Sequence, residues 1–136
     1  MNQPDTQQAL GSMLAIDDGE EYAYTTRDFE DENGRFGWID RDDGAEILIG
    51  EKSSFELMDE PYEGLLCKIR LVNRASLEPS GALETITEAL RNNAVSFALQ
   101  DGGTTFDGQN IAGVLYIPLE SREKVHKLFE RLGLFR

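Results

Sequence analysis

The sequence has little of what several classes of protein need. Its one cysteine, Cys67, cannot form a disulfide bridge within the chain, so a disulfide scaffold suited to an oxidising compartment is not expected. With one histidine, His126, a zinc site built from cysteine and histidine is not expected either. No stretch approaches about eighteen consecutive apolar residues, and residues 1–14 lack the pattern of a signal peptide. We therefore expect a cytoplasmic protein without metal, cofactor or membrane span.

Positive charge is scarce as well. Lysine and arginine number 13 against 26 aspartates and glutamates, which gives a formal net charge of −13 at pH 7. Such a field repels nucleic-acid phosphates and anionic lipid surfaces, so neither is an expected partner. Two interpretations of the acidity stay open. It serves solubility, or it serves docking on a basic partner protein.

What the sequence does have is a globular composition and a regular second half. Its 136 residues, 40% of them hydrophobic, suit one compact domain or two small ones that share a core. Hydrophobic periodicity predicts strands over 65–72, 94–100 and 111–119, a Gly-rich loop or long hairpin turn over 101–110, and helices over 80–92 and 120–133. This β-α-β-β-α order places both helices on one face of an antiparallel-rich sheet, which is the ferredoxin-like α+β pattern.

The first half reads as a weaker version of the same unit. Apolar spacing predicts a helix over 5–14, alternation predicts a strand over 20–26, and Asp43-Gly44 between two apolar runs predicts a hairpin. A short helix or irregular connection follows over 51–64. The expected organisation is a truncated half over 1–62 and a complete β-α-β-β-α domain over 63–136, packed through their sheets.

Four stretches, in order along nearly the whole chain, together resemble the ACT-domain proteins. They are "DTQQALGSMLAIDDGEEYAYTT", "RDDGAEILIG", "CKIRLVNRASLEPSGALETITEALRNNAVS" and "VLYIPLESREKVHKLFERLGL". The chain is most similar to a small bacterial family of uncharacterised tandem ACT-like chains. The resemblance implies a regulatory, non-catalytic module that binds an amino acid or a related small molecule.

In ACT domains the ligand lies at the junction between the first strand and the first helix. The resemblance therefore implies ligand-binding residues in the segment that follows the 65–72 strand, namely Asn73, Ser76, Leu77, Glu78, Ser80 and Gly81. A helix N-terminus suits a carboxylate, and Glu78 or Asp101 would face the amine. The alternative stays open that Ser76 or Ser80 only caps the helix, with Pro79 in its first turn.

No other residues suggest catalysis. His126 is expected to be a solvated or edge histidine, and Cys67 a buried, inert thiol. Trp38 and Phe36 alternate on a strand and are expected in the core or an interface. No pair of groups reads as acid, base or nucleophile, so we do not expect an enzyme.

Assembly and function follow from these patterns. A β-α-β-β-α unit leaves a strand edge or a sheet face uncovered, so we expect a homodimer. Two function classes remain: a sensor of an amino-acid-like effector, and an acidic protein-interaction module of the inhibitor or immunity type.

Overall fold

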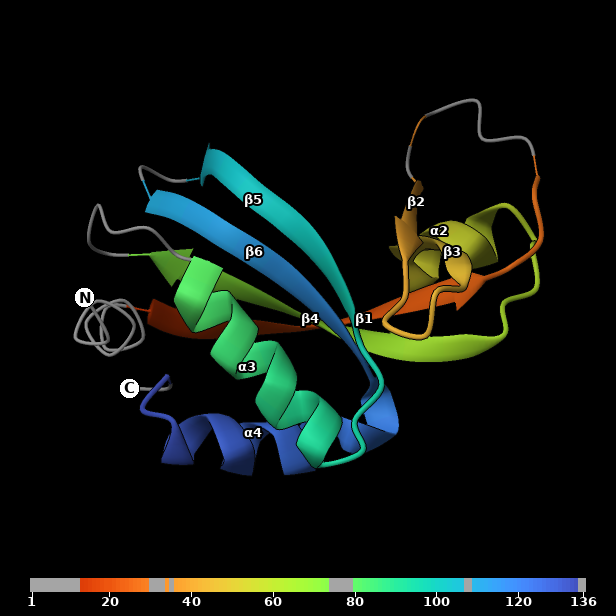
Figure 1. Cartoon of the computed structure of the whole chain (residues 1–136). Helices are drawn as coiled ribbons and strands as arrows, with labels where there is room; N and C mark the ends of the chain where they lie inside the picture. Colours follow the sequence, from red (N-terminus) through yellow and green to blue (C-terminus); the bar gives the residue numbers. More distant parts are fainter. Residues whose placement is uncertain (1–12, 30–33, 35, 74–79, 107–108, 135–136) are drawn as a thin grey trace.

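The computed structural model describes residues 13–29, 34, 36–73, 80–106 and 109–134, which form an α+β fold (Figure 1). Within these residues, six strands make one antiparallel sheet in the order β2-β3-β1-β4-β6-β5. The strands are β1 (Met13–Thr25), β2 (Gly37–Asp40), β3 (Glu46–Glu51), β4 (Gly64–Asn73), β5 (Ala98–Phe106) and β6 (Gln109–Pro118). The helices are α2 (Lys52–Leu57), α3 (Ser80–Asn92) and α4 (Arg122–Arg131), with the 3-10 turn η1 (Leu119–Ser121) before α4.

The second half follows the predicted order β4-α3-β5-β6-α4. Both α3 and α4 cover the same face of the sheet (Figure 1), where Ile86 and Phe129 join Cys67, Ile69 and Leu71 in one buried apolar cluster. The residues of β4 alternate between the two faces of the sheet, so its odd-numbered positions meet the helices. This arrangement is compatible with a ferredoxin-like fold.

The glycine-rich stretch after residue 100 differs from the prediction, because most of it is strand. β5 continues to Phe106, and its pairing with β6 shifts register between Asp101 and Thr104. Such an irregularity accommodates the two glycines that lie between these residues without ending the strand.

The N-terminal helix prediction is wrong for the part of it that the structure describes. Met13 and Leu14 belong to strand β1 and pair with Asn73 and Val72 of β4. Met13 and Ala15 are buried in the cluster beneath the helices, so pairing with β4 and burial on one face outweigh the helical spacing. The rest of that predicted helix lies outside the described residues.

Strand β1 covers the edge of β4 that the β-α-β-β-α unit alone would leave unpaired. It pairs along β4 from Met13 to Tyr24 and, near its end, with β3 as well. It thus occupies the place beside β4 that the last strand of a β-α-β-β-α-β unit would take. The β4 edge, one of the two grounds for the homodimer expectation, is therefore covered, and the two halves share one sheet. The homodimer itself stays a prediction.

The predicted β2–β3 hairpin is confirmed. The N–H of Gly44 donates to the carbonyl of Arg41 at 2.8 Å, and Gly44 has a φ of 90°, which favours glycine at this turn. The tip of the hairpin reaches the other edge of the sheet, since the N–H of Asp42 donates to the carbonyl of Phe97 at 2.8 Å. Arg41 also forms an isolated antiparallel bridge with Ala98, at the start of β5. The sheet therefore curves until its two edges meet at this point.

The second face of the sheet holds a smaller apolar cluster where the hairpin folds over it. Its buried members are Tyr22, Ile47, Ile49, Leu66, Ala98 and Tyr116. On the opposite side of β3, α2 adds an aromatic group in which the rings of Phe36 and Phe55 lie 4.8 Å apart, centroid to centroid. Phe36 is packed as expected, whereas Trp38 is 43% exposed and is not a core residue.

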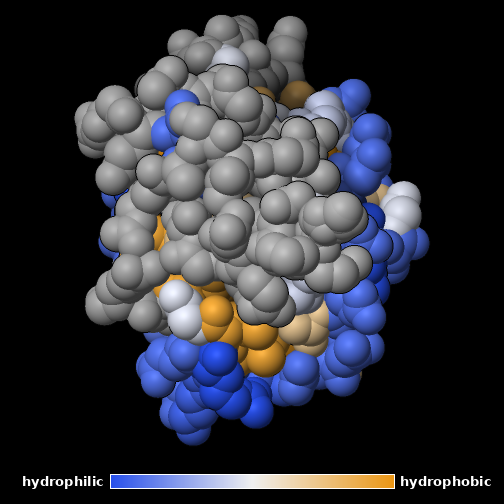
Figure 2. Space-filling view, turned by 60° about the vertical axis from the view of Figure 1, so that its left-hand side comes forward, coloured by the Kyte–Doolittle hydropathy of each residue, from blue (hydrophilic) through white to orange (hydrophobic). Residues whose placement is uncertain are grey.

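Hydrophilic residues make up most of the described surface that Figure 2 shows, with an apolar patch beside the residues drawn in grey. None of the described helices is both long and apolar enough to cross a membrane.

Candidate ligand-binding site

The expected effector site at the end of β4 is described only in part. Asn73 ends β4, is buried, and pairs with Met13 on one side and Asn110 on the other. Ser80 and Gly81 open α3, and the carbonyl of Gly81 accepts a hydrogen bond from the hydroxyl of Thr85 at 3.0 Å. The other predicted residues of the segment, Ser76, Leu77 and Glu78, lie outside the described residues. A pocket at this junction stays a prediction.

Asp101, expected beside that junction, lies in the middle of β5. It pairs with Gly113 of β6, which in turn pairs with Leu71 of β4. β6 therefore separates Asp101 from β4 by two strand spacings, about 10 Å. A role of Asp101 at the junction stays a prediction.

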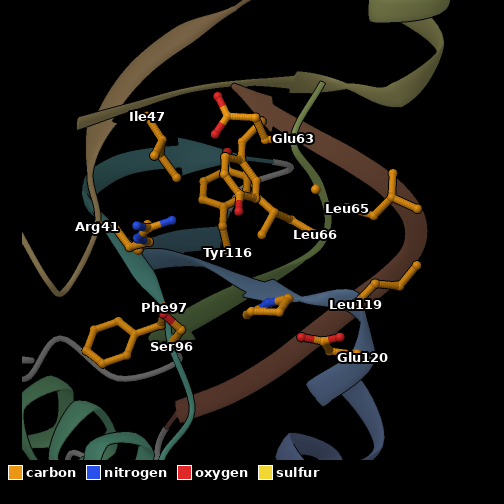
Figure 3. A pocket seen from close by; sticks show the side chains of 14 residues that line it. Arg41, Ile47, Glu63, Leu65, Leu66, Ser96, Phe97, Tyr116, Leu119 and Glu120 are labelled. Atoms are coloured by element: carbon orange, nitrogen blue, oxygen red, sulfur yellow. The ribbon is translucent and has the colours of Figure 1, made fainter. Parts of the chain in front are cut away.

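The structure places a cavity at the opposite end of β4. The cavity has a volume of about 560 Å³ and lies between the β2–β3 hairpin, the start of β4, the segment before β5 and the end of β6. Figure 3 shows side chains from these segments around it, among them Arg41, Ile47, Glu63, Leu66 and Tyr116. Small-molecule sites in proteins typically have volumes of about 300–1,000 Å³. The size therefore suits a small organic ligand.

Apolar and aromatic side chains form the inner wall. Ile47, Leu66 and Tyr116 are buried members of the second apolar cluster, and the ring of Tyr116 meets that of Tyr22 edge-on at 5.9 Å. Burial raises the pKa of Tyr116, and the negative charge of Asp18 adds to the effect. The phenol therefore stays neutral at pH 7 and adds no charge to the wall.

Arg41 forms the cationic part of the lining, and its charge is already matched. Its Nε and Nη2 donate to the two carboxylate oxygens of Asp43 at 3.0 and 2.8 Å. Its guanidinium carbon also lies 5.8 Å from the centre of the Tyr24 ring. The hydrogen bonds with Asp43 raise the pKa of Arg41 and lower that of Asp43, so both groups are charged and paired.

Glu63 and Glu120 bring negative charge to the lining. Oε2 of Glu63 accepts hydrogen bonds from the hydroxyls of Thr25 and Thr26 at 3.1 and 2.6 Å, and from the N–H of Thr26. The hydrogen bonds from Thr26 are the main reason why the pKa of Glu63 is lowered, so this carboxylate is ionised at pH 7. Glu120 is exposed on η1.

A few polar contacts hold the hairpin over the cavity. Besides the backbone bond from Asp42 to Phe97, Nε of Arg91 on α3 donates to Oδ1 of Asp42 at 3.0 Å. The Arg91 guanidinium also lies 5.5 Å from the centre of the Phe97 ring. In Figure 3 that ring points away from the other labelled side chains. We call the contacts of Asp42 with Phe97 and Arg91 the hairpin latch.

A second charged cluster is formed by residues that are not part of the cavity lining. Asp17, whose side chain is 4% exposed, accepts hydrogen bonds from Nε and Nη2 of Arg122, both at 2.8 Å, and lies 2.8 Å from Nε2 of His126. Burial alone would raise the pKa of Asp17, but the hydrogen bonds from Arg122 and His126 outweigh it and lower that pKa. The cluster joins an irregularity in β1, between Asp17 and Glu21, to the start of α4.

Predictions from the sequence concern His126, which belongs to this cluster, and Cys67. His126 is partly exposed, as expected of an edge residue, but its contact with Asp17 had no signal in the sequence because 109 positions separate them. Cys67 is buried, as predicted, and burial raises its pKa to about 11, so it remains a thiol. In the part of the chain that the structure covers, no three histidine, cysteine or acidic side chains gather to hold a metal ion.

Neither a family model nor a curated protein matches the chain. A crystal structure from Vibrio cholerae has a similar fold, with a TM-score of 0.68 over 96% of this chain and 97% of that one. That protein is described as one of unknown function and a possible transport protein. At 13% identity the likeness shows a shared α+β fold across nearly the full length of both chains.

Proposed function

We propose that the chain is a non-catalytic regulatory protein that binds a small organic molecule in the cavity between its β2–β3 hairpin and its second half. The observation that carries the proposal is the cavity of about 560 Å³ itself, with a buried aromatic and apolar wall and charged groups in its lining. This combination is typical of sites that bind small ligands by apolar contact and orient them by a few polar groups.

The walls of the cavity suggest how binding could regulate. One wall belongs to the hairpin, through Arg41 and Ile47, and the other to the sheet of the second half, through Leu66 and Tyr116. A ligand that contacts both walls binds the closed arrangement more tightly than an open one. It would therefore shift the population towards the closed arrangement.

The resemblance to ACT-domain proteins supports an effector of amino-acid size. In those proteins the ligand lies at the first strand–helix junction, which here is the Asn73 end of β4. The proposal places the ligand at the Gly64 end of β4 instead, because the cavity lies there.

A thermal-shift screen tests the proposal. The compounds are the standard amino acids, the corresponding amines and the corresponding carboxylates. A ligand at about one hundred times its Kd stabilises the folded state by about 2.7 kcal/mol. For a domain of this size that free energy raises the Tm by roughly 10 °C.

Two tryptophan variants then locate the site. Ser96 is an exposed residue of the lining, and Ser96→Trp is expected to fill the cavity mouth and abolish the shift. Ser53→Trp is the matched control, since Ser53 is exposed on α2 and is not part of the lining. Gly81→Val should leave binding unchanged. Binding that survives Ser96→Trp and fails in Gly81→Val would return the site to the junction.

The acidic interaction module predicts a different outcome. In that case no compound of the screen shifts the Tm, and Ser96→Trp behaves like the wild type in every small-molecule assay.

A further inference from the structure

The charges around the cavity are not balanced. The cation of the lining, Arg41, is held by both oxygens of Asp43. Glu63 and Glu120 are two further carboxylates in the lining. The ion pairs among the described residues involve neither of them. Among the described residues, the lining and Asp43 together therefore carry two more negative charges than positive ones.

Glu63 is held in place without being neutralised. Its described hydrogen-bond donors, Thr25 and Thr26, are uncharged, and they fix the carboxylate beside the start of β4. Arg41 makes only a small contribution to the lowered pKa of Glu63, after the hydrogen bonds from the threonines. A fixed and ionised carboxylate at the border of an apolar cavity attracts a cation.

The aromatic wall favours a cation as well. Tyr116 lines the cavity, and aromatic rings attract ammonium groups; the other lining tyrosine, Tyr24, already lies 5.8 Å from the Arg41 guanidinium carbon. The net charge of −13 adds a field of the same sign around the whole chain. A ligand carboxylate would meet Arg41 already paired with Asp43 and would have to approach two further carboxylates, Glu63 and Glu120.

On these grounds we propose that the cavity recognises its ligand through a positively charged amine, so that the effector is a small cationic amine with an apolar body. This inference rests on the proposed function and specifies the chemistry of the same site.

Matched compounds that differ in charge test the inference. The pairs are phenethylamine with 3-phenylpropanoate, tryptamine with indole-3-propanoate, and hexylamine with heptanoate. Within each pair the apolar body is the same, so the sign of the charge is the variable. At least one amine is expected to raise the Tm and bind in calorimetry, with affinity that falls as salt is added, while its carboxylate partner does not bind. The zwitterion phenylalanine should bind more weakly than phenethylamine.

Two variants connect the charge to the cavity. Glu120→Gln should weaken amine binding by about three- to tenfold, since it removes one partly screened charge contact. Glu123→Gln is the matched control: it changes the net charge equally, but Glu123 lies on α4 outside the lining. Glu63→Gln is a second variant that tests the charge. Circular dichroism of this variant checks that it folds although its contacts with Thr25 and Thr26 are altered.

The outcomes separate the two proposals. If carboxylates bind as well as the amines or better, and Ser96→Trp blocks them, the cavity is a ligand site and the amine inference is wrong. If amines bind equally to the wild type, Glu120→Gln and Glu63→Gln, they bind elsewhere and the inference is also wrong. If neither these compounds nor the wider screen produces binding, the proposed function fails and the inference fails with it.

Discussion

The two apolar clusters of the molecule are completed in different ways. The cluster between the sheet and helices α3 and α4 is sealed by aliphatic and phenylalanine side chains, several of them with no exposed surface. The cluster beneath the hairpin contains two tyrosines, borders the cavity, and is covered through the polar hairpin latch. The cluster beneath the helices is covered by apolar packing. The cluster beneath the hairpin is covered through polar contacts, which water can replace. A cavity at the second cluster therefore lies where the structure can adjust to a ligand.

The same substitution in each cluster gives the largest expected effects. Ile86 on α3 has no exposed surface, and Ile86→Ala should lower the free energy of unfolding by about 4 kcal/mol. Ile47 is 1% exposed and lines the cavity. Ile47→Ala should lower the free energy of unfolding by about 2 kcal/mol, because the space it vacates joins an existing cavity and creates less new empty surface. Urea unfolding measures both values. Equal losses would mean that the two clusters are equally tight.

Breaking the Asp17 cluster, which joins β1 to the start of α4, should have an intermediate effect on the free energy of unfolding. Arg122→Ala removes two hydrogen bonds from a carboxylate that is 4% exposed, and should lower the free energy of unfolding by about 2–3 kcal/mol. Lys127→Ala is the control on the same helix. Its pair with Glu123 is 3.6 Å long and well exposed, so a change below about 0.5 kcal/mol is expected. A loss in Arg122→Ala no larger than that of the control would show that Asp17 does not hold β1 to α4.

Acid should weaken the same contact. The folded state lowers the pKa of Asp17 below its usual value of 3.8. The stabilisation is therefore complete above that value and is lost as the pH falls through the lower pKa of the folded state. Between these values one carboxylate changes the stability by up to about 1.4 kcal/mol per pH unit. Urea unfolding from pH 5 downwards should give a steeper decline for the wild type than for Asp17→Asn. Parallel curves would contradict the assignment.

The sequence predicted the second half of the fold better than the first, because periodicity reports local burial. The bounds of α3 were predicted correctly since its apolar residues recur on one stripe that faces the sheet. β1 was not recognised at Met13 because its register is set by β4, some sixty positions later in the chain. The hairpin was predicted because Asp43-Gly44 is a local turn signal, but its closure onto Phe97 is a long-range contact.

The candidate site shows the same limit. The junction that follows Asn73 could be proposed as a site from the sequence because its polar residues lie close together along the chain. The cavity is assembled from Tyr24, Arg41, Glu63 and Tyr116, which lie on four separate segments and form no motif. These residues become neighbours only when β1, β4 and β6 pair and the hairpin folds over the sheet.

The smallest effect on overall stability is expected at the hairpin latch, and it bears most directly on how the cavity opens. Arg91→Ala removes a partly exposed ion pair with Asp42, so the free energy of unfolding should fall by about 0.5 kcal/mol. The local effect should be larger: the amide of Asp42, which donates to Phe97, should exchange its hydrogen about three- to fivefold faster, while the amides of β4 beneath α3 stay unchanged. Arg131→Ala, at the exposed end of α4, is the matched control. A ligand that bridges the two walls should slow exchange at Asp42 again in Arg91→Ala. Uniformly faster exchange across the sheet would mean that the hairpin does not open by itself and that both clusters belong to one cooperative unit.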